Sequence, residues 1–502
     1  MKITLIDPTQ SITNYGLRAL ANSLVRLNHD VQLVFMNQPV IDYDYEYPQR
    51  IYHDLRRIVA DSDCIGLSFV SNFYGQAEKL TRYLHNQCDI PVIWGGIHAM
   101  AAPEKSLETA DFVCIGEGEA CLESFCDELK TGRNWRNVPN LWFRENGGIV
   151  RDDPAPLNPD IDSCSMPLYD NNREYIRRGD SLLPMQDDYR KDIMGSDSAY
   201  YDLKESIAYP YLTMASRGCP NSCAYCCNNL FKSVYRGKGK LLRRRSNAQI
   251  IAELEMILGK MPYVNIVEFF DDDFLYPDRS TISEFAGLYK TRIGLPFRCN
   301  FRPESVTHEK LAYLKEAGLI SIEMGLQSAR TNNLYKRHFN RETFRKACDE
   351  INNLGGMVPH YDIIVDNPLE KIGDVRETLR FIAELPRPYH IAAYSLTFFP
   401  GTQLHELAKS KGLISNEIRD IINKKNFVQY EFRQPFVKFL IFYIRNISFE
   451  KPVFKGIFNG LTSRLFMPVF NSIFFYPLWI GILFGKRLST KIRHPEIPLF
   501  PK

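Results

Sequence analysis

The stretch from Ser216 to Cys226, SRGCPNSCAYC, holds Cys219, Cys223 and Cys226 within eight residues. Three thiolates at this spacing can bind three irons of a cubic iron–sulfur cluster, whose complete ligation by protein takes four cysteines. One iron then keeps an open position, and an open metal position is where chemistry takes place. The run Leu212–Ala215 predicts a strand that leads directly into this loop.

Two other uses of the cysteines are less favoured. A structural zinc site needs a fourth ligand, usually from a second cysteine or histidine pair, and no such pair lies nearby. Cys227 directly follows Cys226, so we do not expect its side chain to point at the same metal. A disulfide framework is disfavoured because the 12 cysteines are spread over 502 residues and the first residues read as a strand, not as a secretory signal. We therefore expect a reducing, cytoplasmic compartment.

Length and composition set wide limits. A chain of 502 residues has room for two or three domains, and 45% hydrophobic residues support sizeable cores. The net charge of +3 is nearly balanced and predicts no nucleic-acid partner. One local basic run, Arg236–Arg245, is interpreted as a solvated loop or, alternatively, as a contact to an anionic substrate or to cofactor carboxylates.

Short apolar runs alternate with amphipathic stretches over about the first 130 residues, which predicts a doubly wound parallel sheet. Ligands of such sheets bind at the carboxyl ends of the strands. Two glycine-bearing segments fall there, Gly95-Gly96 and Gly116–Glu119. No GxGxxG motif follows the first strand, so a dinucleotide site is not predicted. The expected strands are Lys2–Ile6, Val31–Phe35, Cys64–Phe69, Pro91–Trp94 and Phe112–Ile115, and the expected helices are Leu17–Leu27 and Gln76–Leu84.

Strands and helices alternate again from Tyr211 to about residue 405. Roughly six β/α units predict a partial (β/α)6 barrel of the TIM type, whose active site lies just after the strands. Gly318 is expected to end a helix over Leu311–Ala317. The expected strands are Leu212–Ala215, Asn265–Phe270, Phe297–Asn300, Ser321–Leu326, Tyr361–Val365 and Ala392–Phe398, with further helices over Ala248–Leu258 and Arg341–Leu354.

The cysteine spacing, with Gly218 before it and Tyr225 just inside the last cysteine, resembles the radical S-adenosylmethionine (SAM) enzymes. The segments Gly95–His98 and Gly116–Glu119 resemble the cobalamin (B12)-binding domain that precedes many radical SAM domains. The resemblance implies three cofactors: a [4Fe-4S] cluster on Cys219, Cys223 and Cys226, SAM on the open iron, and cobalamin in the first domain.

The resemblance also implies SAM contacts after the barrel strands. Arg302 would hold the SAM carboxylate through two parallel hydrogen bonds. Gln327 and Ser328 would contact the ribose and methionine parts, although relatives often carry Glu where this chain has Gln327. The pair Asp271 and Asp272 would contact SAM or substrate, with a capping or loop role as the alternative. Tyr225 would lie against the adenine, and packing alone is its alternative.

On the cobalamin side, glycines would let the backbone approach a flat macrocycle that side chains would block. The Asp-x-His-x-x-Gly signature of cobalt ligation is absent after the first strand, so histidine ligation is not predicted. His98 would bond the amides of the corrin ring or would be a satisfied polar residue. If the domain lacks its cofactor, the same positions are structural turns. The implied cofactor residues are Asn14, Gly16, Ser68, Gly95, Gly96, His98, Glu117, Gly118 and Glu119.

We expect an α/β protein in four regions. These are a flavodoxin-like cobalamin-binding domain over 1–140, a linker over 141–205, a radical SAM domain over 206–405 and a mainly helical, hydrophobic region over 406–502. In the last region the apolar run Phe439–Ile444 precedes the 20-residue run Leu465–Phe484. The longer run is interpreted as a helical lid, an interfacial membrane anchor or a membrane span, and its internal prolines fit an interfacial patch better than a span.

The resemblance implies an enzyme that cleaves SAM reductively and, with cobalamin, methylates an unactivated carbon of a small molecule, for which a hydrophobic compound would suit the C-terminal region. The bound cofactors would carry out the cleavage of SAM and the methyl transfer, so no side chain is assigned as acid or base. An electron donor such as flavodoxin or ferredoxin is implied. The alternatives are a cobalamin-dependent cyclase or oxidoreductase, a sulfur-inserting enzyme that would need another cluster, and a non-catalytic cobalamin or iron–sulfur sensor.

Overall fold

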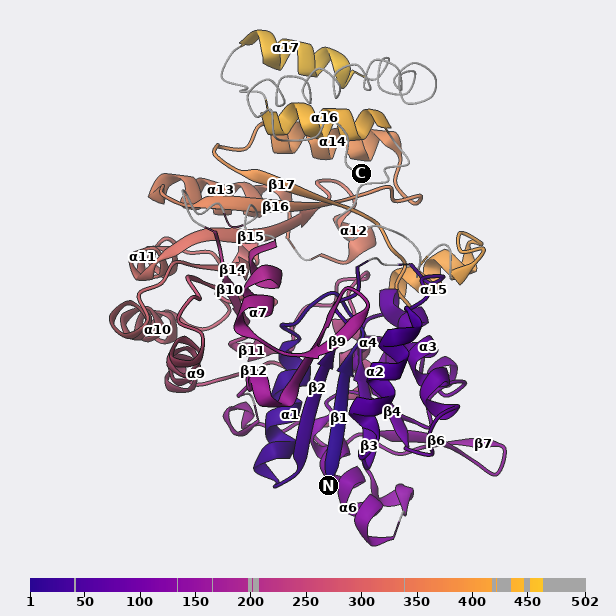
Figure 1. Ribbon diagram of the computed structural model, residues 1–502. Coiled ribbons are helices and arrows are strands. Elements are labelled where there is room, and N and C mark those ends of the chain that lie inside the picture. Colours follow the sequence, from indigo (N-terminus) through magenta and orange to yellow (C-terminus); the bar gives the residue numbers. More distant parts are fainter. Residues whose placement is uncertain are drawn as a thin grey trace.

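Two large sheets with flanking helices make up most of the protein (Figure 1). The computed structural model describes residues 1–39, 42–132, 134–164, 166–196, 201, 207–337, 339–417, 421, 435–446 and 452–463. In Figure 1 the first sheet is indigo to purple and the second runs from magenta to orange.

The first sheet has nine strands in the order β7-β6-β5-β4-β3-β1-β2-β8-β9. The six strands from β5 to β8 in this order run parallel, and the outer strands are antiparallel to their neighbours. The chain order reverses at β1, which creates a crevice at the carboxyl ends of the strands. The central strands are β1 (Lys2–Asp7), β2 (Asp30–Phe35), β3 (Cys64–Ser68), β4 (Val92–Gly95) and β5 (Phe112–Cys114).

Helices cover both faces of this sheet because successive strand residues point to opposite sides. Leu5 packs in one core with residues of α1 (Tyr15–Arg26) and α6 (Glu119–Thr131). Ile6 packs in the other core with residues of α2 (Gln49–Val59) and α3 (Tyr74–His85). The doubly wound parallel sheet is therefore confirmed. The short helices α4 (Gly96–Ala101) and α5 (Pro103–Ser106) follow β4.

The expected linker over 141–205 instead contributes four strands to the first sheet. One pair extends the β5 edge and the other extends the β2 edge. The sequence shows little periodicity here because each of these strands has only four or five residues, too few for a clear alternation. They are β6 (Leu141–Glu145), β7 (Gly148–Arg151), β8 (Glu174–Arg178) and β9 (Ser181–Pro184), and α7 (Asp187–Met194) follows.

The second sheet has six parallel strands in sequential order, β10-β13-β14-β15-β16-β17, as a partial (β/α)6 barrel requires. The strands are β10 (Pro210–Thr213), β13 (Ile266–Phe269), β14 (Phe297–Phe301), β15 (Leu319–Gln327), β16 (Val358–Val365) and β17 (His390–Ser395). The main helices between them are α9 (Asn247–Lys260), α10 (Arg279–Arg292), α11 (His308–Ala317), α13 (Arg341–Leu354) and α14 (Ile372–Ala383). Short elements are α8 (Asn228–Val234), α12 (Asn332–Tyr335), α15 (Gln403–Ser410) and the ribbon β11 (Ser216–Arg217) with β12 (Arg243–Arg244).

Local signals set several helix ends. Side chains of Ser246, Asp278 and Thr307 cap the first turns of α9, α10 and α11 by accepting a backbone N–H. Gly318 ends α11 with φ at +113°, in the left-handed region, which confirms the expected stop.

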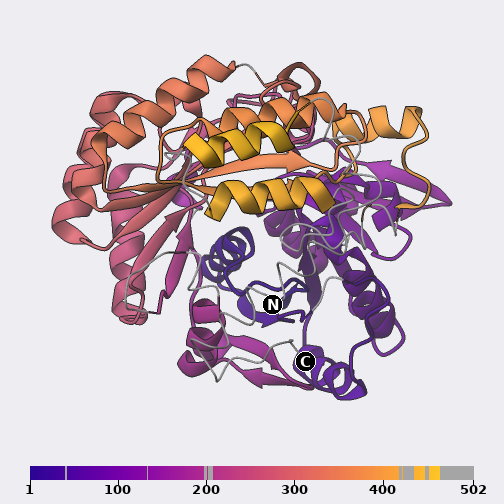
Figure 2. The same cartoon turned by 90° about the horizontal axis from the view of Figure 1, so that it is seen from above.

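The helix α16 (Pro435–Asn446) contains the first C-terminal apolar run and lies against α14 and β17, as Figure 2 shows from above. Its side chains Phe436, Leu440 and Ile444 are fully buried. The apolar run therefore packs against other parts of the same protein, α14 and β17 among them. Helix α17 (Pro452–Leu461) follows. Among the helices that the structure describes, none has the length and apolar character to cross a membrane. The run Leu465–Phe484 lies outside the described residues.

Candidate active site between the two sheets

A cavity lies where the carboxyl ends of the first sheet meet the cysteine loop of the second domain. The first domain contributes aliphatic side chains, glycines and Ser68, and the second contributes residues that precede or follow the cysteines, together with Asp272. The sequence-predicted residues that line it are Gly16, Ser68, Gly95, Gly96, Glu117, Gly118, Glu119 and Asp272.

The floor of the cavity at β4 accepts only glycine. Gly96 has φ at +86°, and a Cβ atom there would lie 2.8 Å from both the backbone N and O of Phe69. Ser68 Oγ would be 2.9 Å from the same atom. The neighbouring backbone of Phe69 therefore requires glycine at position 96. Gly95 also lines the cavity, and beyond its chain neighbours no described atom would lie closer than 3.9 Å to a Cβ atom there, so bare backbone at this position leaves room for a flat macrocycle.

The cysteine loop places a nitrogen near each sulfur. Asn221 Nδ2 lies 3.6 Å from Cys219 Sγ, the Asn228 N–H nitrogen 3.5 Å from Cys226 Sγ, and Arg302 Nη1 4.0 Å from Cys223 Sγ. Donors in these positions could hydrogen-bond to the sulfur atoms of a bound iron–sulfur cluster. Among the described residues, no three His, Cys, Asp or Glu side chains gather as they would around a single metal ion. In a cluster each thiolate binds its own iron, so its ligands are spaced differently.

Side chains of α8 hold the loop from behind. Lys232 Nζ donates to the carbonyl oxygens of Pro220 at 2.6 Å and Asn221 at 2.5 Å, and Asn229 Nδ2 donates to the Cys223 carbonyl at 2.7 Å. These bonds satisfy carbonyl oxygens of a loop that forms neither a helix nor a strand and so has no regular backbone hydrogen bonds to satisfy them.

The aspartates after β13 have different positions. Asp271 is fully buried and accepts hydrogen bonds from Ala215 N, at 2.9 Å, and from Ser216 Oγ. Asp272 lines the cavity and accepts from Asn228 Nδ2 at 3.0 Å. Burial raises the pKa of both carboxyls. Asp271 thus supports the loop, as the alternative interpretation holds, whereas Asp272 faces the site.

Sequence reasoning missed Asp273. Its carboxyl accepts from Ser305 Oγ and from the Arg302 N–H at 3.4 Å, and burial raises its pKa to about 6. Arg302 itself donates through Nη2 to Glu304 Oε1 at 2.7 Å. Its expected contact to the SAM carboxylate stays a prediction.

Tyr225, Gln327 and Ser328 lie at the barrel end but do not line the cavity. The Tyr225 hydroxyl accepts from Arg337 Nη1 at 2.5 Å, and its ring meets that of Tyr335 edge-on. Gln327 has φ at +64°, and its Oε1 has no hydrogen-bond partner among the described residues. Ser328 Oγ accepts from the backbone N–H of Arg330 at 3.2 Å and so shapes the turn.

Two predicted residues of the first domain lie beside the cavity, not in it. Asn14 caps α1 by accepting from Leu17 N. His98 is buried between the rings of Phe69 and Tyr74, with Nδ1 3.0 Å from Ser71 Oγ, and burial lowers its pKa to about 4. The ring is therefore only partly satisfied, since Nε2 has no hydrogen-bond partner among the described residues, and the expected bond from His98 to the corrin amides stays a prediction.

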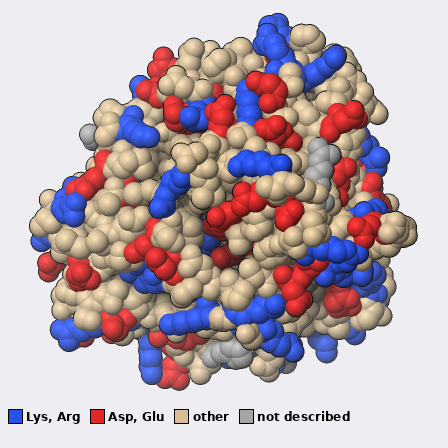
Figure 3. Space-filling model, turned by 90° about the horizontal axis from the view of Figure 1, so that it is seen from below, with Lys and Arg blue, Asp and Glu red and all other residues tan. Residues whose placement is uncertain are grey.

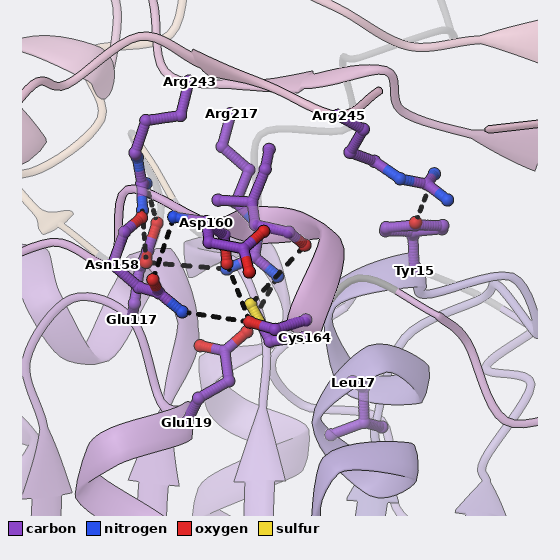
Figure 4. A network of polar contacts seen from close by, with 12 residues as sticks. Tyr15, Leu17, Glu117, Glu119, Asn158, Asp160, Cys164, Arg217, Arg243 and Arg245 are labelled. Carbon is purple, nitrogen blue, oxygen red and sulfur yellow. Dashed lines mark hydrogen bonds and ion pairs between the residues drawn. The ribbon is translucent and has the colours of Figure 1, made fainter. Parts of the chain in front are cut away.

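The carboxylates of Glu117 and Glu119 meet arginines of the second domain (Figure 4). Arg217 Nη2 lies 2.7 Å from Glu119 Oε1, and Arg243 pairs with Glu117 through both terminal nitrogens. Arg243 and Arg245 are buried, so the solvated-loop interpretation of the basic run is wrong for them. Sequence reasoning missed Arg217, although its place two residues before Cys219 was a usable signal.

Comparison with known families agrees with these positions. Residues 1–125 match the B12 binding domain, and residues 214–382 match the radical SAM superfamily. The chain belongs to the radical SAM enzymes that carry a B12-binding domain. Its cofactors are a [4Fe-4S] cluster, SAM and cobalamin. The cysteines with nitrogen donors beside them fit the cluster, and the glycines at the end of β4 fit cobalamin.

Two sequence relatives and two solved structures match between 79% and 99% of this chain. An uncharacterized methyltransferase of Pyrococcus horikoshii is 25% identical, covering 91% of this chain and 95% of that protein. An anaerobic magnesium-protoporphyrin IX monomethyl ester cyclase of Cereibacter sphaeroides is 25% identical over 79% of this chain and 58% of its own length. The radical SAM methyltransferase TsrM of Kitasatospora setae matches in fold with a TM-score of 0.63 at 17% identity, covering 82% of this chain and 77% of TsrM. The cobalamin-dependent enzyme OxsB matches with a TM-score of 0.64 at 16% identity, covering 99% and 69%.

Proposed function

We propose that this radical SAM enzyme is a methyltransferase that adds a methyl group to an unactivated carbon of a small molecule. The observation that carries the proposal is the shared cavity. The glycine floor at Gly96 and the residues that flank the cysteines, Gly218 and Asn228, line the same space. The similarity to the Pyrococcus horikoshii methyltransferase over nearly the whole of both chains supports the same reaction class.

The bound cofactors would supply the reactive centres: cobalt accepts and passes on a methyl group, and the cluster passes an electron to SAM. Each turnover then consumes two SAM molecules, two electrons and the substrate. One SAM loses its methyl group and leaves as S-adenosylhomocysteine. The other would be split with one electron into methionine and 5′-deoxyadenosine, the latter carrying the hydrogen atom taken from the substrate. The electrons come from an external one-electron donor of the flavodoxin or ferredoxin class.

The protein residues position these groups and take no proton in the reaction. We propose that Cys219, Cys223 and Cys226 bind the cluster, and that Arg302, held beside Cys223, binds the SAM carboxylate. Asp272 lines the cavity from the second domain and would contact SAM or substrate. Gly16, Ser68, Gly95, Gly96 and Gly118 would contact the macrocycle.

The domain limits are part of the same proposal. We place the cobalamin-binding domain and its added strands over residues 1–196 and the radical SAM domain over 207–405, because the two sheets occupy these ranges.

Anaerobic turnover with SAM labelled in its methyl group tests the proposal. The reconstituted enzyme, cobalamin and a candidate substrate pool should yield 5′-deoxyadenosine, S-adenosylhomocysteine and a labelled product. Deoxyadenosine without S-adenosylhomocysteine would exclude methyl transfer and favour a cyclase or oxidoreductase, a class that the similarity to the Cereibacter sphaeroides cyclase also allows. A variant with Cys223 changed to Ala should form none of the three.

A further inference from the structure

Two arginines of the second domain face two glutamates of the first across the edge of the cavity. Arg217 and Arg243 stand opposite each other on the ribbon of β11 and β12. Directly opposite residues of such a ribbon point to the same face, where two like charges would repel. Glu117 and Glu119, on either side of Gly118 at the start of α6, supply the two balancing charges.

The contacts in this group are close and partly shielded from water. Arg217 reaches Glu119 at 2.7 Å and Glu117 at 3.5 Å, and Arg243 Nη1 reaches Glu117 at 3.1 Å and the Asn158 carbonyl at 2.8 Å. The four side chains are between 4% and 22% exposed. Burial alone would lower the pKa of Arg217, but the charges of Glu119 and Glu117 outweigh it and raise that pKa. Shielded, forked arginine–carboxylate contacts are stronger and more directional than surface ion pairs.

Three further hydrogen bonds join the domains beside this group. The Glu117 N–H donates to the Tyr235 hydroxyl at 2.7 Å. The Tyr15 hydroxyl donates to Glu253 Oε2 at 3.0 Å and accepts from Arg245 Nη1 at 2.9 Å (Figure 4). The segment Gly116–Glu119, which the sequence assigns to the cofactor, is thus mainly a contact between the domains.

A short, stiff stretch of chain connects Arg217 to the cluster. Gly218 separates it from Cys219 and has φ at +85°, and a Cβ atom there would collide with the Leu241 carbonyl. On the other side, Ser216 is held by Asp271. Both chain neighbours of Arg217 are therefore fixed within the second domain, so the cysteine loop should keep its shape when only the Arg217 side chain is changed.

We propose that Arg217, Arg243, Glu117 and Glu119 form a latch that fixes the distance between the cysteine loop and the cobalamin cavity. Arg217 is its positioning residue for methyl transfer between the two. The inference rests on the proposed function, because only a step that crosses from one domain to the other needs this distance to be fixed. SAM cleavage takes place within the second domain and does not need the latch.

Full-length variants test the latch in two ways. Arg217→Gln removes the charge, Arg217→Lys keeps the charge without the fork, and Arg217→Glu with Glu119→Arg exchanges the partners. Arg292→Gln is the matched control, since Arg292 pairs with Glu255 at 2.8 Å on the exposed surface of the second domain alone.

The first measurement is amide hydrogen exchange over residues 114–120 in protein without cofactors. Arg217→Gln should speed exchange at Glu117, whose N–H bond to Tyr235 spans the domains, and the control should not. Unchanged exchange in Arg217→Gln would overturn the latch.

The second measurement is anaerobic product formation with SAM, cobalamin and chemical reductant. Since a misplacement of 1 Å can cost about 100-fold in rate, Arg217→Gln should form S-adenosylhomocysteine about tenfold more slowly or worse. Deoxyadenosine formation and the paramagnetic signal of the reduced cluster with SAM should stay near wild type. Lysine should restore part of the rate, and the exchanged pair most of it.

An equal fall in both products would overturn the inference, because it would make Arg217 a local support of the cysteine loop. So would a loss of bound cobalamin with unchanged exchange, which would make Arg217 a direct cofactor contact. If the wild-type enzyme forms no S-adenosylhomocysteine, the proposed function fails, and the exchange measurement still decides the latch.

Discussion

At Gly96 the requirement for one residue type comes from the backbone and from its neighbours together. The positive φ disfavours any L side chain, and Phe69 leaves no space for a Cβ atom. The Gly-Gly pair after an apolar run was enough to predict this position from sequence. By contrast, the position of His98 depends on Phe69 and Tyr74, which lie more than 20 residues earlier in the chain.

Gly96→Ala should weaken cobalamin binding and leave SAM cleavage intact. To relieve the contact with Phe69, the backbone at Gly96 must move away from the position that the macrocycle would meet. A loss of about 1.4 kcal/mol of contact with the cofactor would weaken the affinity about tenfold. Titration with hydroxocobalamin, followed by absorption, measures this. Gly132→Ala is the control, because nothing lies within 4 Å of a Cβ atom there. Equal affinity of the two variants would contradict a close backbone approach at Gly96.

Asp7 gives the stability of the first domain a pH dependence. Burial raises the pKa of Asp7 from 3.8 to about 6. Because the pKa is higher in the folded state, the contribution of Asp7 is full below about pH 4 and is lost as the pH rises through about 6. The loss is about 3 kcal/mol, from roughly two pKa units at 1.36 kcal/mol each.

Asp7→Asn should therefore stabilise the protein at pH 7 and have little effect near pH 4. Urea unfolding of the first domain between pH 4 and pH 8 measures the difference from wild type. Asp153→Asn serves as control, since that side chain is 96% exposed. A stability gain that does not depend on pH would show that Asp7 is ionised at the same pH in both states.

At the scale of elements, the end of β13 supports the loop after β10. Asp271 satisfies Ala215 and Ser216 in the neighbouring strand end, and Asp272 is left to face the cavity. The DD pair is visible in the sequence, but its division of roles is not, because both aspartates follow β13 outside the strand and only their hydrogen-bond partners in the folded protein distinguish them. The buried ribbon β11–β12 was missed for the same reason: only the fold places Arg243 opposite Arg217.

Asp271→Ala should prevent stable cluster assembly, whereas Asp272→Ala should assemble the cluster normally and lose SAM cleavage or turnover. Asp271→Ala leaves the buried N–H of Ala215 without a partner, which costs about 1–3 kcal/mol in the loop that carries the cysteines. Iron and sulfide per chain after anaerobic reconstitution measure assembly. Equal iron content in the two variants would contradict our proposal that Asp271, and not Asp272, supports cluster assembly.

At the scale of the whole molecule, the first domain extends well beyond residue 140. Arg18 on α1 pairs with Glu174 on β8 at 2.9 Å with both side chains fully buried, and Arg190 on α7 lies 3.2 Å from the same carboxylate. Removing one partner of a buried pair costs about 3–5 kcal/mol. Over the molecular surface in Figure 3, basic and acidic side chains are intermingled, as the net charge of +3 leads one to expect.

A fragment of residues 1–196 should fold, and a fragment of residues 1–140 should not. The shorter fragment leaves Arg18 buried without its carboxylate and exposes the β2 edge that β8 covers. Circular dichroism with thermal unfolding, and resistance to protease, distinguish the two. Cooperative unfolding of the shorter fragment would restore the boundary that the sequence predicts.

The sequence by itself determined both fold classes, the cofactors and the glycine positions at the strand ends, and it predicts the three cysteines that we propose for the cluster. Spacing and hydrophobic period are local properties, and each of these features depends on neighbours in the chain. Only the tertiary structure decided which polar side chains face the cavity, that the strands over 141–184 complete the first sheet, and that Glu117 and Glu119 join the two domains. Those outcomes depend on partners such as Arg217 and Arg243, about 100 residues or more away, which approach only when hydrophobic burial has packed the two sheets together.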